Sequence, residues 1–196
     1  MTQTPTATYS DETMERYSGV AGPLDDAADE RFLNTTKAYL GSLEGGFHAK
    51  PYRVKNDDGS YGNLTIGHGF EYIDGKPITA DMTITEEESN KILENYITQI
   101  DSYFNEKYPA YGNLPVNAQG ALVSFAYNNG MYVVDQPKNK ILRKAMLEGD
   151  MNKIAEAMAL YTKGSNGKFS KGLDNRRKDE IQMFLNNSNR GFSYED

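Results

Sequence analysis

Apolar side chains in the first patterned part of the chain recur at helical spacing. Between Leu24 and Glu44 they fall three or four residues apart, and the glycines Gly45 and Gly46 follow directly. The pattern predicts a helix over residues 24–44 that ends at these glycines. Glu44 would then lie at the helix C-terminus, where the helix dipole disfavours a second negative charge and favours a protonated carboxyl group.

The spacing changes from helical to alternating between Pro51 and Tyr72. Large apolar residues alternate with polar ones on both sides of Asp57-Asp58-Gly59, a sequence typical of a tight turn. This pattern predicts a small antiparallel sheet of two or three strands. The run Asp74-Gly-Lys-Pro77 predicts a second turn after it.

Helical spacing returns at residue 85. The run Thr85-Glu-Glu-Glu88 has the form of a capping box, and the apolar positions after it predict a helix to about Asn105. Asn117 is predicted to cap a helix that is apolar on most sides and that ends at Gly130. Further helices are predicted over residues 140–148, 151–161 (capped by Asp150) and 173–185.

The order of these elements is one helix, a small sheet and then a run of helices. That order predicts an α+β fold in which a small antiparallel β-sheet lobe lies beside a mostly helical lobe, with a cleft between them. Residues 26–187 are expected to form the folded domain. Residues 1–25, rich in Thr, Ser, Asp and Ala, are expected to be a flexible N-terminal tail or a docking arm, and residues 188–196 a C-terminal tail.

Composition narrows the possible functions. The chain has 196 residues and a formal net charge of −7, so we expect one domain and no nucleic-acid partner. It contains no cysteine, and its two histidines form no recognised ligand motif, so neither a metal nor a cofactor is predicted. No apolar run is long enough for stable membrane insertion, no signal peptide is seen, and we expect a monomer.

The carboxyl groups near the first predicted helix and turn suit cleavage of a glycosidic bond. That reaction needs one protonated carboxyl group and a second carboxylate that stays ionised. Glu44 is flanked by apolar residues that would raise its pKa, whereas Asp57 and Asp58 lie in a wetter turn, and Thr65 could hold a water. The alternative is a surface glutamate followed by an ordinary hairpin turn, and the pattern alone leaves both interpretations open.

These motifs resemble those of the phage-type, T4-like lysozymes, the muramidases of glycoside hydrolase family 24. Glu44-Gly45, the turn aspartates and Thr65-Ile-Gly-His-Gly69 are similar to the family's Glu–Asp–Thr signature. Later segments keep the family's order from about residue 35 to residue 187: Ala121-Leu-Val-Ser-Phe-Ala-Tyr-Asn-Asn-Gly130, Ile141-Leu-Arg-Lys144 with Glu148-Gly-Asp150, and Lys171-Gly-Leu-Asp-Asn-Arg-Arg-Lys-Asp-Glu180.

The resemblance implies a lysozyme-like fold and a peptidoglycan hydrolase. Such an enzyme cleaves the β-1,4 bond between N-acetylmuramic acid and N-acetylglucosamine with inversion. By resemblance Glu44 is the general acid, Thr65 positions the attacking water, and Asp58, with Asp57 as its rival, activates that water. The positions that match the family's substrate-binding residues are Phe70, Glu71, Tyr127, Asn128, Asn175 and Arg176.

One departure from the family pattern keeps other functions open. The family's aspartate typically precedes the threonine by six positions, and Gly59 occupies that place here. A lytic transglycosylase on the same fold needs the acid but no such aspartate, and is therefore an alternative. A non-catalytic wall-binding or virion structural protein is another.

The resemblance also implies where such a protein acts. A phage lysozyme is located in the host cytoplasm until it is released to the cell wall, or it is associated with the virion. Its partner beyond peptidoglycan would then be a holin, or a virion or tail protein that contacts residues 1–25.

Charged residues in the C-terminal half have two possible uses. Arg176, Arg177 and Glu180 either bind substrate carboxylates or form an ion-pair network that ties the last helix to the sheet lobe. His68 is expected to be a structural donor within its turn. Despite the net negative charge, a polyanionic glycan could be attracted by the basic residues Lys140, Arg143, Lys144, Lys168, Lys171, Arg176, Arg177 and Lys178.

Overall fold

The computed structural model describes residues 26–43, 45–55, 59–164 and 167–186. Its helices and strands follow the predicted order. They are α2 (Asp26–Leu43), β1 (His48–Lys55), β2 (Tyr61–Gly67), β3 (Tyr72–Ile73), β4 (Lys76–Pro77), α3 (Glu86–Lys107), α4 (Val116–Asn129), α5 (Lys140–Glu148), α6 (Met151–Met158) and α7 (Lys171–Leu185). Short 3-10 turns, which the pattern did not predict, lie at Tyr111–Asn113, Val133–Asp135 and Pro137–Asn139.

The β-structure consists of two antiparallel pairs. Strands β1 and β2 form a hairpin in which Tyr52 lies opposite Thr65 and Lys55 opposite Tyr61. Strands β3 and β4 form a separate, shorter pair around the predicted turn, where Asp74 has a φ of +50° and Gly75 a φ of +71°. The prediction of a small antiparallel sheet after the first helix is therefore confirmed.

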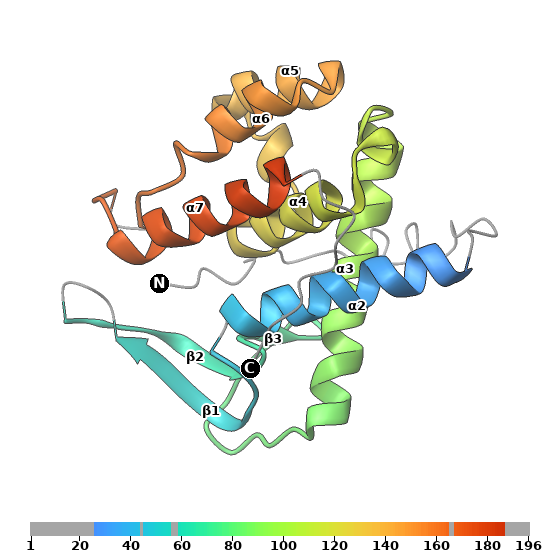
Figure 1. The fold of residues 1–196 in the computed structure, drawn as a ribbon. Helices are drawn as coiled ribbons and strands as arrows, with labels where there is room; N and C mark the ends of the chain where they lie inside the picture. Colours follow the sequence, from blue (N-terminus) through green and yellow to red (C-terminus); the bar gives the residue numbers. More distant parts are fainter. Residues whose placement is uncertain (1–25, 44, 56–58, 165–166, 187–196) are drawn as a thin grey trace.

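Helix α4 is the centre of the molecule. Its residues from Gly120 to Asn128 are all buried, and it contacts α2, α3 and α7. A helix that is apolar on nearly every side can bury its surface only when other helices surround it, which is the arrangement in Figure 1. A smaller apolar cluster of Ile66, Ile78 and Ile84 packs beside the hairpin.

The hairpin lies to one side of this helical body. In Figure 1 the β1–β2 hairpin extends away from α4 and α7, while the long helix α3 passes alongside both parts. A small sheet lobe beside a larger helical lobe is thus confirmed, and the cleft between them stays a prediction. Within the described ranges, no helix combines the length and apolar character that crossing a bilayer requires.

Side-chain caps explain where several helices begin. The Thr85 hydroxyl accepts a hydrogen bond from the Glu88 amide, and the Glu88 carboxylate accepts one from the Thr85 amide, so the predicted capping box is confirmed. Asp150 caps α6 as predicted, and Gly130 ends α4.

The prediction that Asn117 caps α4 is wrong, because Pro115 occupies the N-cap position. The Asn117 amide instead donates to the Met183 carbonyl at 2.6 Å, and also to the carbonyl of Asn186, at the C-terminal end of α7. The last carbonyls of a helix need partners other than the amides of the next turn, and the side chain of Asn117 supplies a donor at this end of α7.

Candidate active site

The predicted general acid, Glu44, lies outside the described residues, and the structure places the segments on either side of it. Helix α2 ends at Leu43. Gly45 has a φ of +76°, and the Gly46 amide donates to the Gly41 carbonyl at 3.2 Å. This bond is the usual closure of a helix that ends in a left-handed glycine. The predicted glycine stop next to position 44 is therefore confirmed.

The predicted aspartates, Asp57 and Asp58, also lie outside the described residues. Their position along the chain is nevertheless bounded by the hairpin, because Lys55 and Tyr61 are the last paired residues of β1 and β2. Gly59 follows with a φ of +84°, a left-handed conformation that glycine adopts without strain. The two aspartates thus fall in the segment of the chain between β1 and β2.

Thr65 is described fully. It lies in β2 opposite Tyr52, it is 3% exposed, and its hydroxyl donates to the Tyr52 carbonyl at 3.3 Å. That distance is long for a hydroxyl donor, so the bond is weak. The hydroxyl also keeps its lone pairs, through which it can accept a hydrogen bond from a water.

Glu71 lies close to the same face of the hairpin. Its carboxylate accepts a hydrogen bond of 3.1 Å from the amide of Asn63. Asn63 and Thr65 are two positions apart on β2, so their side chains share one face of the strand. Glu71 is half-buried and Asn63 exposed, so polar groups of this face can be reached by a ligand. The sequence pattern missed Asn63, because one exposed asparagine in a strand carries no distinctive signal.

Two of the predicted substrate-binding residues form an aromatic layer inside the protein. Phe70 stacks on Tyr96 with ring centroids 5.8 Å apart, and Tyr96 meets Tyr127 edge to face at 6.1 Å. Phe70 and Tyr127 are each 1% exposed. Direct contact with a sugar would require these rings to become exposed. In the structure they belong to the packed interior beside the turn after β2.

Two further predicted substrate-binding residues are buried among charged partners. Asn128 accepts a 2.8 Å hydrogen bond from Arg177. Arg176 donates to the Glu180 carboxylate at 3.0 Å, and Ser124 donates to the same oxygen at 2.7 Å. The structure thus bears out the ion-pair interpretation of this group. The expectation that the network ties the last helix to the sheet lobe was wrong. The network joins α7 to α4 rather than to the sheet lobe.

Asn175 is the most accessible of the predicted contacts. It is exposed on the first half of α7. Together with Glu71 it leaves two of the six predicted substrate-binding positions with surface available to a ligand.

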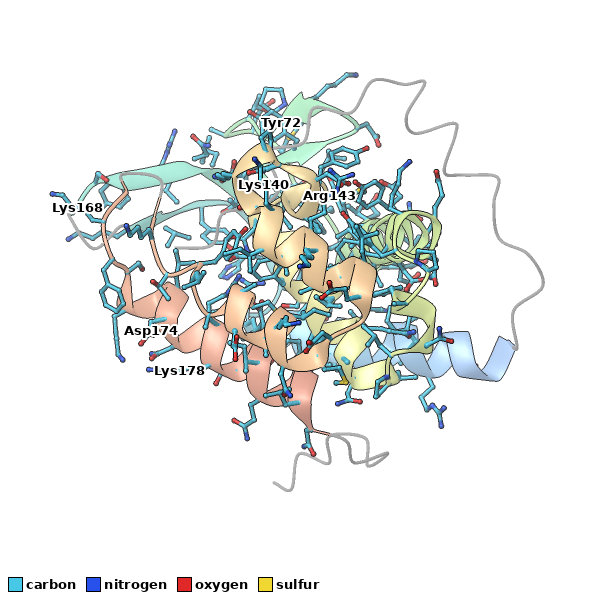
Figure 2. The ribbon with its side chains drawn as sticks, turned by 90° about the horizontal axis from the view of Figure 1, so that it is seen from above. Tyr72, Lys140, Arg143, Lys168, Asp174 and Lys178 are labelled. Carbon is cyan, nitrogen blue, oxygen red and sulfur yellow. The ribbon has the colours of Figure 1, made fainter. Side chains whose placement is uncertain are left out.

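The basic residues of the C-terminal half do not form one patch. Figure 2 shows Lys140 and Arg143 on α5, well apart from Lys168 and Lys178. Several are paired with acids: Arg143 lies 3.3 Å from Asp135, and the side chains of Lys171 and Lys178 both lie within about 3 Å of Asp174. Pairing reduces the positive field that this half of the chain can present to a glycan.

A polar contact in the turn after β2 links two elements that the pattern treated separately. His68 Nδ1 lies 2.6 Å from the Ser89 hydroxyl of α3, and both side chains are buried. Burial lowers the pKa of His68, against a smaller upward influence of Glu86. His68 was expected to be a structural donor within its turn; it is a buried structural residue, but its side-chain partner lies outside the turn, on α3, and which atom donates depends on the imidazole tautomer. Ser89 was missed, although a serine on the buried face of an amphipathic helix is itself a signal of a buried polar partner.

The described side chains offer no obvious metal site. Within residues 26–43, 45–55, 59–164 and 167–186, no three His, Asp or Glu side chains come together as potential ligands.

Solved structures with a similar fold indicate the class of the protein. The mixed helical fold with its small hairpin is similar to that of an endolysin from Escherichia coli O157:H7 phage FAHEc1, with a TM-score of 0.61, 27% identity, and coverage of 86% of this chain and 96% of that one. It is also similar to the muramidase domain of SpmX from Asticaccaulis excentricus, with a TM-score of 0.57, 25% identity, and coverage of 78% and 95%.

Sequence comparison identifies the family. The phage lysozyme family model matches residues 42–180, and the chain belongs to that family of enzymes. The chain is also 28% identical over 165 residues to an endolysin of Bacillus phage B103. The match covers 83% of this chain and 58% of that relative, so the chain spans little more than half of the relative's length.

Proposed function

We propose that this chain is a lysozyme that hydrolyses peptidoglycan at the β-1,4 bond between N-acetylmuramic acid and N-acetylglucosamine. The observation that carries the proposal is the family match over residues 42–180, which includes Glu44, Asp57, Asp58 and Thr65. The similarity to a muramidase domain supports the choice of bond.

The proposed mechanism divides the chemistry among these residues. Glu44, next to the glycine stop of α2, donates a proton to the leaving sugar oxygen. An aspartate at the end of the hairpin, Asp58 or Asp57, activates water on the opposite face of the sugar, and Thr65 helps to hold that water. Inversion requires the two carboxyl groups to be roughly 6.5–9.5 Å apart, so that water fits between them.

Loss of the acid is the first test. Glu44→Gln removes the proton donor while it nearly preserves side-chain size, and it should reduce clearing of a peptidoglycan suspension by about a hundredfold or more. Glu106→Gln, an exposed substitution in the last turn of α3, is the matched control and should clear at the wild-type rate. Equal clearing by Glu44→Gln and wild type would refute the assignment, and clearing by neither would favour a non-catalytic wall-binding protein.

The aspartates and the threonine are tested separately. Asp57→Asn and Asp58→Asn should differ, with the larger loss of rate identifying the residue that activates water. Asp74→Asn, in the exposed turn between β3 and β4, provides the matched control. Thr65→Ala should reduce the rate less than loss of the acid does. Unchanged rates in both Asp57→Asn and Asp58→Asn would remove the aspartates from the mechanism.

The spacing between aspartate and threonine favours one second candidate. Because Gly59 lies six positions before Thr65, the chain could act as a lytic transglycosylase, in which the sugar's own 6-hydroxyl closes an anhydro ring. Mass spectrometry of digested wall separates the two reactions. A reducing muramic end supports hydrolysis, whereas a 1,6-anhydro end supports the transglycosylase.

The proposed biological setting is degradation of a bacterial wall by a phage, at lysis or at entry. In the first case the protein reaches the wall from the host cytoplasm through a holin, and in the second it travels with the virion. Residues 1–25, which lie outside the described residues, are the proposed docking arm for a virion or tail protein. Immunoblotting of purified virions would separate these settings.

A further inference from the structure

The turn that follows β2 is short and tightly closed. The Ile66 amide donates to the Phe70 carbonyl at 3.0 Å, and the Phe70 amide donates to the Ile66 carbonyl at 2.9 Å. This pair of bonds encloses His68 at the centre of the turn. Thr65 immediately precedes the turn, so the path of the turn determines where the Thr65 side chain lies.

The side chain of His68 ties this turn to α3. Its Nδ1 lies 2.6 Å from the Ser89 hydroxyl, and the exposed fractions are 7% for His68 and 0% for Ser89. Ser89 belongs to the first turn of α3, and its amide donates to the Thr85 carbonyl behind the capping box. Ser89, to which His68 bonds, is therefore itself held in place by the start of α3.

Gly67 makes this approach possible. It has a φ of +63°, and a Cβ atom at this position would lie 2.5 Å from the Ser89 hydroxyl oxygen and 3.0 Å from the Phe70 ring. No side chain fits at such distances. The glycine thus brings the backbone of the turn directly against the hydroxyl that bonds to His68.

A second bond ties the same residue to the helical body. The Tyr127 hydroxyl of α4 donates to the His68 carbonyl at 3.1 Å. His68 is consequently held through its side chain by α3 and through its backbone by α4. By comparison, the side chain of Thr65 makes a long hydroxyl bond of 3.3 Å to the Tyr52 carbonyl of β1.

We propose that His68 and Ser89 are a positioning pair, which fixes the turn after β2 and thereby sets the Thr65 hydroxyl for the reaction. This inference rests on the proposed function. Neither member of the pair touches substrate, because both are buried, and both act through Thr65. If the hydroxyl of Ser89 is removed, the turn keeps its backbone bonds and the Phe70 contact with Tyr96 of α3, but it loses the side-chain bond that His68 makes to α3.

The test compares three variants on soluble peptidoglycan fragments of defined length, for which kcat and KM can be measured separately. Ser89→Ala removes the hydroxyl. His68→Phe keeps a ring but removes the bond. His68→Asn places an amide oxygen or nitrogen where Nδ1 was, and so can restore the bond to Ser89. Ser170→Ala is the matched control, because Ser170 is also a buried serine whose hydroxyl accepts one hydrogen bond, at the start of α7.

A positioning role predicts a pattern that lost stability alone does not give. Ser89→Ala and His68→Phe should lower kcat about tenfold per folded molecule with KM within about twofold of wild type, as expected when water is misplaced rather than substrate lost. His68→Asn should recover most of kcat, and Ser170→Ala should lose stability but keep its kcat. The methyl NMR signal of Thr65 should shift in Ser89→Ala and not in Ser170→Ala.

Each contrary outcome has a distinct meaning. An unchanged kcat and an unshifted Thr65 methyl signal in Ser89→Ala would overturn the positioning role while leaving the proposed function intact. A His68→Asn variant as slow as His68→Phe would show that the bond to Ser89 is not the cause. If wild type cleaves nothing, the proposed function fails, and the Thr65 signal alone still decides whether the pair positions that residue.

Discussion

At the scale of single residues, the environment of a side chain decides what its chemistry can be. His68 is a clear case, because burial lowers its pKa, Lys37 lowers it further, and Glu86 acts in the opposite direction. The folded protein therefore favours the neutral imidazole at neutral pH. The unfolded chain has no such burial, so its histidine takes up a proton at higher pH.

This difference predicts how the stability depends on pH. Because the pKa of His68 is lower in the folded state, the unfolded state binds more protons as the pH falls through about 6.5, and the stability contributed by His68 is lost. Between about pH 7.5 and about pH 5, wild type should lose more unfolding free energy than His68→Phe does. Urea unfolding at several pH values measures this, with His48→Phe, in the exposed histidine of β1, as the control. Parallel curves for wild type and His68→Phe would contradict the prediction.

For single residues, the sequence was sufficient to predict some structural environments and not others. The position of Thr65 in a strand next to a turn follows from the alternation of its neighbours, and the structure agrees. The depth of Phe70 and Tyr127 could not be predicted, because an aromatic side chain is equally consistent with a sugar-binding surface and with a core. Only the packing of Tyr96 between them decides for the core.

At the scale of elements, the sequence predicts well whatever is decided locally. The bounds of α5, the capping box of α3 and the turn at Asp74 all depend on residues within a few positions of one another. The prediction that Asn117 caps α4 was wrong because its hydrogen-bond partner is not local. A side chain near a helix start usually caps that helix, and here its partner is the end of α7, 66 positions away in the sequence.

Asn117 therefore stabilises a helix to which it does not belong. Asn117→Ala should lower the unfolding free energy by about 1–2 kcal/mol, because it removes the side-chain hydrogen bond to the Met183 carbonyl at the end of α7. Asn105→Ala is the control, since the exposed Asn105 amide bonds to groups of Asp101, one turn away in α3. Urea midpoints measure both, and hydrogen exchange should rise at the end of α7 in Asn117→Ala alone. Equal, small losses in the two variants would show that the cap contributes nothing.

At the scale of the whole molecule, a buried charged cluster joins helices that are distant in the sequence. Glu180 is fully buried in α7, with Arg176 and Arg177 both 3.0 Å from its carboxylate, and Arg177 also lies over the Phe125 ring of α4. Burial lowers the pKa of Arg177 to about 10, so it still carries its charge at neutral pH. The sequence left open whether these charges bind substrate or pair with one another, and it predicted pairing with the sheet lobe rather than with α4, since the true partner depends on how α7 packs.

The cluster predicts an unusual response to mutation. Glu180→Leu removes the carboxylate that both buried guanidinium groups contact and should cost about 3–5 kcal/mol of unfolding free energy. Adding Arg177→Met to that variant removes the charge that Glu180 compensated on Arg177, so the double variant should be more stable than Glu180→Leu alone. Glu148→Leu, which removes a partly exposed partner of Lys144 and Lys153, should cost less than about 1 kcal/mol. Chemical unfolding measures all three variants. A double variant that is less stable than Glu180→Leu would mean that Arg177 holds α7 against α4 through Asn128 and Phe125, and that its charge needs no acid beside it.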